Sequence, residues 1–336
     1  MDKVMLRLLL LLLVANFMPL PVSAQGLFAV INPGGDRQSA VLTPSSGNLR
    51  ALGSPVGGEP VSTSGSSEAI DRSGNRLFLV GTPNGDPTKL FVLSTITGAV
   101  LASPNVSGAG NGIVFEDWDG GESKLFALLS VGSGDRQLAT VNIATGAVTT
   151  LGSPLAGGGL STGGAHALDP TGNRFFFVGA PGASPDALYS INTTNGAEIS
   201  SPNLPATILA VRNLAWDAGE NLLFGLFSTP TGEAQLGTIN IATGAVSLRG
   251  NPIVTGNLST FGAALDESSD LLFIAGQPQA GSRTVYAIDT ASGIEADSQL
   301  MSGVANDILA LLIDPGPLFA DGFGSQNLSA WSFSQP

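Results

Sequence analysis

The sequence predicts an all-β chain that folds as a six-bladed β-propeller, and the first observation behind this prediction is a repeat. An aspartate that ends a short apolar segment recurs along the chain at Asp71, Asp119, Asp169, Asp217, Asp266 and Asp314. Successive copies lie 48, 50, 48, 49 and 48 residues apart. This spacing is typical of one propeller blade, so six copies predict six blades.

The second observation is a glycine in a short turn, which recurs at Gly47, Gly98, Gly146, Gly196, Gly244 and Gly293. A tight connection between two antiparallel strands often requires a residue with positive φ, and glycine adopts that conformation without steric cost. Six such turns predict six hairpins, one for each blade.

The third observation is that each repeat contains four short segments of strand character. In the copy that ends near Ser201, they are residues 165–169, 174–178, 187–192 and 197–201. Gly, Pro, Thr and Asn fill the separators at 170–173 and 193–196, and these residues favour turns. Each repeat therefore predicts one blade of four antiparallel strands.

A longer period of two blades overlies the single one. The sequence Gly-Asp-Arg-Gln at 35–38 recurs at 134–137, and Leu-Gly-Ser-Pro at 52–55 recurs at 151–154. Three two-blade repeats fill the chain. The first copy begins at Leu27 with what should be the second strand of a blade, so we expect the C-terminal strand at 309–314 to complete the blade begun by residues 27–53. Such closure removes exposed sheet edges.

The N-terminus has the features of a cleavable secretion signal. Lys3 and Arg7 precede an apolar run over residues 8–15, and Val-Ser-Ala at 22–24 provides a cleavage site. The run is shorter than the roughly 20 residues that span a bilayer as a helix. We therefore predict a signal peptide at 1–24, a single propeller domain at 25–314 and a tail at 315–336, in a secreted or periplasmic protein with no membrane span after cleavage.

Composition excludes several kinds of partner. Without residues 1–24, the chain has 25 acidic and 11 basic residues, and it has no cysteine. Nucleic acids and anionic lipid surfaces bind through clustered Lys and Arg, which this chain lacks. The absence of cysteine excludes a lipid-anchored lipoprotein and a disulfide-stabilised scaffold. We expect a monomer.

Two segments resemble known families. The tail, from Leu318 to Ser332, resembles a C-terminal tail of the form Phe-x-Asp-Gly-Phe-Glu-Ser-Gly followed by Ser-Ala-Trp, which occurs on exported proteins of certain proteobacteria; here Gly324 replaces the acidic residue. The blades resemble the quinoprotein-like and YVTN-type propeller repeats through residues 188–193 and 285–290. The tryptophan docking motif and vicinal cysteines of quinone-dependent dehydrogenases are missing, so the resemblance does not imply their cofactor.

One position in the first strand of each blade carries the candidate ligand-binding residues. Three residues before the closing aspartate, the blades have Glu68, Glu116, His166, Leu214, Ala263 and Leu311 in turn. Alternation along a strand places this position on the same face as the apolar residue that precedes the aspartate. First strands line the central channel of a propeller. We therefore expect Glu68, Glu116 and His166, with Asp117, to meet near one mouth of the channel as a ligand, metal or acid–base site, the alternative being solvated polar residues.

The turn at 117–122 resembles half of a calcium loop, because it carries Asp117, Asp119 and Glu122, and hard cations bind several carboxylate and carbonyl oxygens of a tight turn. It also aligns with plain turns in the other blades, so a purely structural turn is the alternative. No cofactor other than this possible calcium is predicted. The repeated Arg37 and Arg136 are expected in loops, with side chains in solvent.

The sequence contains few residues of the types that usually carry catalysis. With one histidine and no cysteine, histidine-rich zinc sites and thiol nucleophiles are excluded. The leading hypothesis is a non-enzymatic binding or interaction scaffold for a protein, glycan or small ligand. The alternative is a calcium-dependent lactonase-like or lyase-like enzyme that uses Glu68, Glu116 and His166 at the channel mouth.

Overall fold

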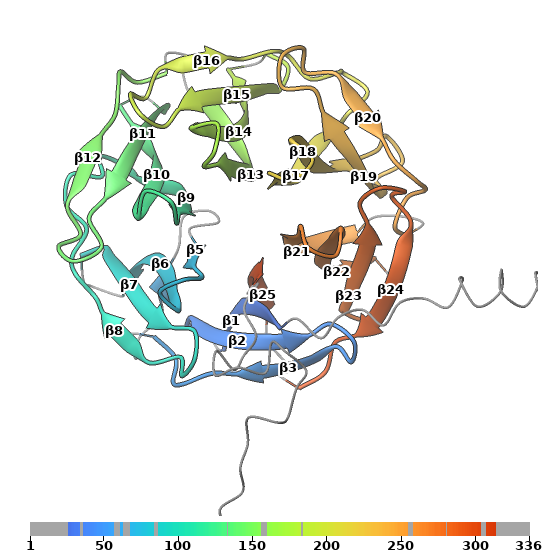
Figure 1. The fold of residues 1–336 in the computed structure, drawn as a ribbon, viewed down its shortest axis with the longest axis horizontal. Helices are drawn as coiled ribbons and strands as arrows, with labels where there is room; N and C mark the ends of the chain where they lie inside the picture. The colour runs from blue at the N-terminus through green and yellow to red at the C-terminus, as the bar shows by residue number, and fades with distance from the viewer. Residues whose placement is uncertain are drawn as a thin grey trace, which may run out of the picture.

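A computed structural model describes residues 26–313, apart from 34–35, 57–60, 63–67, 84–86, 133, 156–159, 183, 255–257, 280 and 304–306. Six antiparallel sheets stand in a ring around a central axis, as Figure 1 shows. The six-bladed β-propeller predicted from the repeat is confirmed. The predicted signal peptide, Asp314 and the C-terminal tail lie outside the described residues.

The first three blades have the following strands, from the axis outwards. Blade 1 contains β25 (Asp307–Ile313), β1 (Leu27–Asn32), β2 (Gln38–Thr43) and β3 (Asn48–Ala51). Blade 2 contains β4 (Val61–Ser62) and β5 (Glu68–Asp71), which both pair with β6 (Arg76–Pro83), followed by β7 (Lys89–Ser94) and β8 (Val100–Ala102). Blade 3 contains β9 (Gly112–Asp119), β10 (Lys124–Val131), β11 (Asp135–Val141) and β12 (Val148–Thr150).

The other three blades repeat this order. Blade 4 contains β13 (Leu160–Asp169), β14 (Arg174–Pro181), β15 (Ala187–Asn192) and β16 (Glu198–Ser200). Blade 5 contains β17 (Ala210–Asp217), β18 (Leu222–Ser228), β19 (Ala234–Ile239) and β20 (Val246–Leu248). Blade 6 contains β21 (Leu258–Asp266), β22 (Leu271–Pro278), β23 (Thr284–Asp289) and β24 (Glu295–Leu300).

Blade 1 closes the ring with both ends of the chain, as the sequence predicts. The C-terminal strand β25 pairs antiparallel with β1, from Leu27 opposite Ile313 to Asn32 opposite Asp307. In Figure 1 the blue and red strands lie side by side in this blade. The pairing satisfies the backbone edge of β1 that would otherwise face solvent.

The inner strand of blade 4 is longer than the predicted segment at 165–169, and a β-bulge explains why the alternation was lost. In blade 4, Thr162 pairs with Gly179 whereas His166 pairs with Phe177, so β13 advances by four residues while β14 moves by two. Similar register shifts interrupt the inner strands of blades 1, 3, 5 and 6. A bulge breaks the two-residue period on which the prediction relied.

The core lies between neighbouring blades. Between blades 3 and 4, for example, Phe115 and Phe126 pack with Phe175 and Phe177, and all four side chains are fully buried. Each blade buries both of its faces against its neighbours. The ring is therefore stabilised by the burial of apolar surface at successive blade junctions.

The turn glycines serve a second purpose that the sequence does not reveal. Gly98 and Gly196 have φ of +70° and +72°, as expected of such turns. A Cβ atom on Gly98 would also lie 2.3 Å from the carbonyl oxygen of Leu52, and one on Gly196 would lie 2.2 Å from that of Leu151. Glycine is required here because the backbones of adjacent blades meet at these turns.

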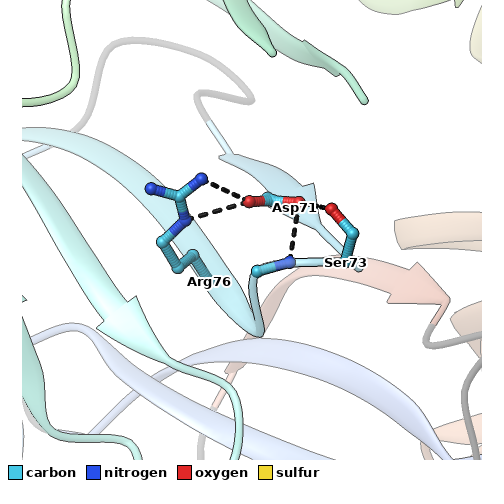
Figure 2. A network of polar contacts seen from close by, with 4 residues as sticks. Asp71, Ser73 and Arg76 are labelled. Carbon is cyan, nitrogen blue, oxygen red and sulfur yellow. Dashed lines mark hydrogen bonds and ion pairs between the residues drawn. The ribbon is translucent and has the colours of Figure 1, made fainter. Parts of the chain in front are cut away.

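The closing aspartates bind the turns that follow them, and Asp71 shows the fullest network (Figure 2). Its carboxylate accepts hydrogen bonds from Nε and Nη2 of Arg76, at 2.9 and 2.5 Å, and from Ser73 and the backbone N–H of Gly74. Although burial opposes them, these hydrogen bonds lower the pKa of Asp71. The Arg76 guanidinium lies 5.4 Å from the ring centroid of Trp118 in blade 3, which joins the two blades.

The same junction recurs between blades 4 and 5 and is replaced between blades 6 and 1. Arg174 pairs with Asp169 at 2.6 Å and stacks 5.0 Å from the ring centroid of Trp216. At the third junction, Leu271 and Ile313 pack together in one apolar cluster. Both partners of the arginine–tryptophan pair are thus replaced together by apolar residues.

No helix in the described part of the chain is long and apolar enough to span a membrane.

Candidate functional site

A cavity of about 590 Å³ lies on the propeller axis and is the candidate site. Its wall comes from the inner strand of every blade: β5, β9, β13, β17, β21 and β25. Small-molecule sites in proteins typically have volumes of a few hundred to about 1,000 Å³. The cavity is therefore large enough for a small ligand.

The predicted ligand-binding residues lie at one level of this cavity. Glu68 pairs with Leu79, Glu116 with Ala127 and His166 with Phe177. Each partner is the fourth residue of the second strand, counted from the residue that pairs with the closing aspartate. All three side chains contribute to the cavity wall. The three apolar counterparts, Leu214, Ala263 and Leu311, also line it. One half of the channel is thus polar at this level and the other half is apolar.

The two glutamates are buried. Glu116 is 0% exposed and Glu68 is 6% exposed. Neither oxygen of the Glu116 carboxyl, nor Oε2 of Glu68, has a hydrogen-bond partner among the described residues. A buried polar group without a partner reduces stability, so a site that retains two of them needs an explanation.

Burial also changes the ionisation of both glutamates. It raises the pKa of Glu68 to about 8, an effect that the positive charge of Arg37 partly offsets. Burial, and secondarily the nearby Glu68 carboxyl, raises the pKa of Glu116 well above its ordinary value. With a pKa of about 8, Glu68 holds its proton at neutral pH, and the burial of Glu116 favours its protonated form as well.

His166 connects blade 4 to the glutamate of blade 3. Its Nε2 lies 3.0 Å from the main-chain oxygen of Glu116, and its ring stacks on Phe115 with centroids 4.6 Å apart. Burial lowers the pKa of His166 to about 4, against the hydrogen bond to Glu116, so the ring is neutral at pH 7. A carbonyl accepts hydrogen bonds, which assigns the proton to Nε2 and leaves Nδ1 as an acceptor. Nδ1 has no partner in the described part of the structure.

Asn213 belongs to this site and was missed by the sequence analysis. It lies on β17 next to a register shift between Val211 and Asn213, and it contributes to the cavity wall. Its Oδ1 is buried and has no hydrogen-bond partner among the described residues. Simple alternation would place Asn213 on the opposite face from Leu214. The signal that could have identified it is a pair of adjacent polar residues, Arg212 and Asn213, in the middle of an inner strand.

The residues proposed for calcium mostly contact the turn itself. Asp119 accepts hydrogen bonds from the backbone N–H groups of Gly121 and Glu122, as the closing aspartates of other blades do in their turns. The Glu122 carboxylate lies 2.7 Å from Nζ of Lys124. In the described ranges, no group of three or more His, Asp or Glu side chains is arranged to hold a metal ion.

Asp117 lies at the rim of the cavity. It accepts backbone hydrogen bonds from Trp118 and from Leu168 of blade 4. Burial raises its pKa to about 6 despite these hydrogen bonds and the charge of Arg72. Asp117 is therefore a carboxylate at neutral pH and contributes negative charge to the rim.

The expectation that Arg37 and Arg136 extend into solvent was wrong. Arg37 is buried, and the Arg136 guanidinium donates hydrogen bonds to the main-chain oxygen of Gly134 and to the hydroxyl of Ser130. Arg136 lies within β11 rather than in a loop. The aliphatic part of an arginine packs well on apolar surface, so a repeated arginine can be a structural residue.

Comparison with known proteins shows the fold. No protein-family model matches the sequence, and no curated protein resembles it in sequence. TolB from Acinetobacter baumannii superimposes with a TM-score of 0.60 at 13% identity, over 90% of this chain and 70% of that chain. A putative TolB from Agrobacterium tumefaciens has a TM-score of 0.54 at 12% identity, over 82% and 90% of the two chains.

A structure with an enzyme's name is similar to about the same degree. A putative 6-phosphogluconolactonase from Bacteroides fragilis has a TM-score of 0.52 at 10% identity, over 88% of this chain and 99% of that chain. At such identities these similarities concern architecture, and one fold serves many functions. The chain has the β-propeller fold of these proteins.

Proposed function

We propose that this protein is an exported binding propeller that holds a small polar ligand in its central channel, against the wall formed by Glu68, Glu116, His166 and Asn213. The observation that carries the proposal is the Glu116 carboxyl, which lines the cavity, is fully buried and has two oxygens without partners in the described structure. A ligand that supplies those partners would remove the energetic penalty of its burial.

The fold itself does not require these polar groups. Blades 5, 6 and 1 carry Leu214, Ala263 and Leu311 at the same level, and they form the same four-stranded sheets. Polar residues kept at a position where apolar residues suffice are typical of binding sites. The channel is therefore a better candidate than the outer surface of the blades.

A stability screen with a channel-filling variant tests this proposal. A set of cationic, anionic and neutral small molecules is added to the mature protein one at a time, and those that bind raise its melting temperature by mass action. Ala263→Phe places a ring in the channel opposite Glu116, whereas Ala144→Phe places the same ring on an exposed turn. We expect the shifts to disappear in Ala263→Phe and to persist in Ala144→Phe.

Two results would contradict the proposal. One is a screen in which no compound stabilises the wild-type protein. The other is a set of shifts that Ala263→Phe leaves unchanged, which would indicate that the compounds bind outside the channel, for example on the outer loops. Export is tested separately by sequencing the N-terminus of the protein recovered outside the inner membrane, where we expect cleavage after Ala24. The quinoprotein-like or YVTN-type resemblance of the blades and the resemblance of the tail to those of exported proteobacterial proteins are retained as predictions.

The calcium-dependent lactonase-like or lyase-like enzyme remains the second candidate, because one observation favours it. Glu116, whose burial favours the protonated form, and the acceptor Nδ1 of His166 line one cavity, and general acid–base catalysis uses such a donor and acceptor. A panel of lactones and esters, incubated with and without calcium, separates the two candidates. Turnover that disappears in Glu116→Gln would establish the enzyme.

A further inference from the structure

The proposed ligand can be defined further from the polarity of the channel wall, and this step rests on the proposed function. Six side chains on the wall have atoms without hydrogen-bond partners among the described residues, and four of them offer acceptors: Oε2 of Glu68, both oxygens of Glu116, Nδ1 of His166 and Oδ1 of Asn213. Once the carboxyls ionise, every one of these atoms is an acceptor. A complementary ligand must therefore bring hydrogen-bond donors.

The charges near this wall favour a cation. In addition to burial, the like charge of the Glu68 carboxyl raises the pKa of Glu116. The positive charge of Arg37 lowers the pKa of Glu68 against the effect of burial. Asp117 adds negative charge at the rim, where Arg72 partly offsets it. His166 is neutral. The whole chain has a net charge of -13, which attracts cations over longer distances.

A bare metal ion fits the wall less well than an organic cation. The described residues contain no group of three metal-capable side chains in a suitable arrangement. The opposite half of the channel offers apolar surface from Leu214, Ala263 and Leu311, which favours a ligand with a hydrocarbon part. A carbon skeleton that carries a charged nitrogen satisfies both halves.

Two indole groups of the channel wall further define the expected shape of the ligand. Nε1 of Trp118 and Nε1 of Trp216 are buried donors without partners in the described structure, and both tryptophans line the cavity. Trp118 lies two residues after Glu116 on β9, a distance along the strand of about 6.6 Å at about 3.3 Å per residue. A ligand acceptor at about this distance from the charged nitrogen would complement an indole N–H.

We propose that the central channel binds an organic ammonium ion, with the charged nitrogen between Glu68 and Glu116 and a hydrogen-bond acceptor of the ligand toward Trp118. The binding step includes a proton transfer. The cation favours the carboxylate form, so a proton leaves the glutamate pair for solvent as the ammonium ion enters. The nitrogen keeps its own protons and donates hydrogen bonds to the carboxyl oxygens of the pair.

Calorimetry with matched amines and alcohols tests this inference. The probes are tyramine with tyrosol, 4-aminobutan-1-ol with 1,4-butanediol, and 1,5-diaminopentane with 1,5-pentanediol. We expect at least one amine to bind about tenfold or more tightly than its alcohol at pH 8. The preference should disappear in Glu116→Gln and weaken in Glu68→Gln. At pH 7, the binding heat should vary with the ionisation enthalpy of the buffer, because a proton is released.

The outcomes separate this inference from the proposed function. If neutral or anionic compounds bind in a manner sensitive to Ala263→Phe while no amine is preferred, the ammonium proposal is wrong and the channel remains a binding site. If calcium chloride alone binds and Glu116→Gln abolishes the effect, the ligand is a metal ion and the ammonium proposal is wrong. If nothing binds in the channel, both proposals fail.

Discussion

The two halves of the central channel occupy equivalent positions in the fold and differ in chemistry. Blades 2, 3 and 4 present Glu68, Glu116 and His166, whereas blades 5, 6 and 1 present Leu214, Ala263 and Leu311. The apolar half shows what the repeat needs in order to fold. The polar half contains buried carboxyl oxygens without partners in the described structure. This difference supports the proposed binding role of the polar half.

The largest expected effect comes from making the apolar half polar. Leu311→Glu places a carboxyl at a site that is 4% exposed and packed within the apolar cluster between blades 6 and 1. We expect the free energy of unfolding in urea to fall by about 3 kcal/mol or more. Leu311→Met, which keeps the volume, should lose less than about 1.5 kcal/mol. A loss below about 1 kcal/mol for Leu311→Glu would show that carboxyls are tolerated all around this level, which would undermine the comparison.

The reverse substitution, from polar to apolar, should have the opposite effect on the free energy of unfolding. Glu116→Leu removes a buried carboxyl and supplies the residue type found in blades 5 and 1, so we expect a gain of about 2 kcal/mol in the free energy of unfolding at pH 8, with loss of ligand binding. Glu122→Leu, at an exposed carboxyl, should change stability by less than about 0.5 kcal/mol. A marked loss of stability in Glu116→Leu would instead assign Glu116 a structural role.

The smallest effect is a pH dependence specific to the polar half. The pKa of Glu68 is raised to about 8 in the folded state, so this residue stabilises the fold below its ordinary pKa, and the contribution is lost as the pH rises through about 8. Between pH 6.5 and 8 we expect unfolding free energy to fall by about 1 kcal/mol, and Glu68→Gln to reduce that slope.

This pH window separates Glu68 and Glu116 from their neighbours. The pKa of His166 is lowered to about 4, so its stabilising contribution is lost only as the pH falls below its ordinary value of 6.5. The pKa of Asp117 is raised to about 6, so the stability linked to it is lost as the pH rises through about 6, before the window begins. Glu122→Gln, at an exposed carboxylate, is the matched control. An unchanged slope in Glu68→Gln and Glu116→Gln would mean that both carboxyls are already ionised.

Much of the site could be predicted because register follows from the repeat. Counting back three residues from Asp119 and Asp169 places Glu116 and His166 at one level, and the structure brings both onto the wall of one cavity. Asn213 could not be placed in this way, because the register shift next to it alters the alternation on which the count depends.

The blade junctions show a similar limit. Arg76 and Trp118 are 42 positions apart in the sequence and meet only when two blades pack, as do Arg174 and Trp216. At the third junction, Leu271 occupies the position of the arginine and Ile313 that of the tryptophan. Both differences are visible in the sequence, but no single segment shows that these two residues are partners. The burial of Arg37 is of the same kind, since it depends on contacts made after the ring closes.

The sequence by itself determined the number of blades, the four strands in each blade, the closure of the ring by the C-terminal strand and the level at which polar residues interrupt the inner strands. These features follow from local turn chemistry and from a period that the chain repeats. The tertiary structure alone decided which atoms lack partners, which carboxyls hold protons and which residues of adjacent blades meet. Burial and proximity set hydrogen bonding and ionisation, and both arise only when segments about 50 residues apart pack together.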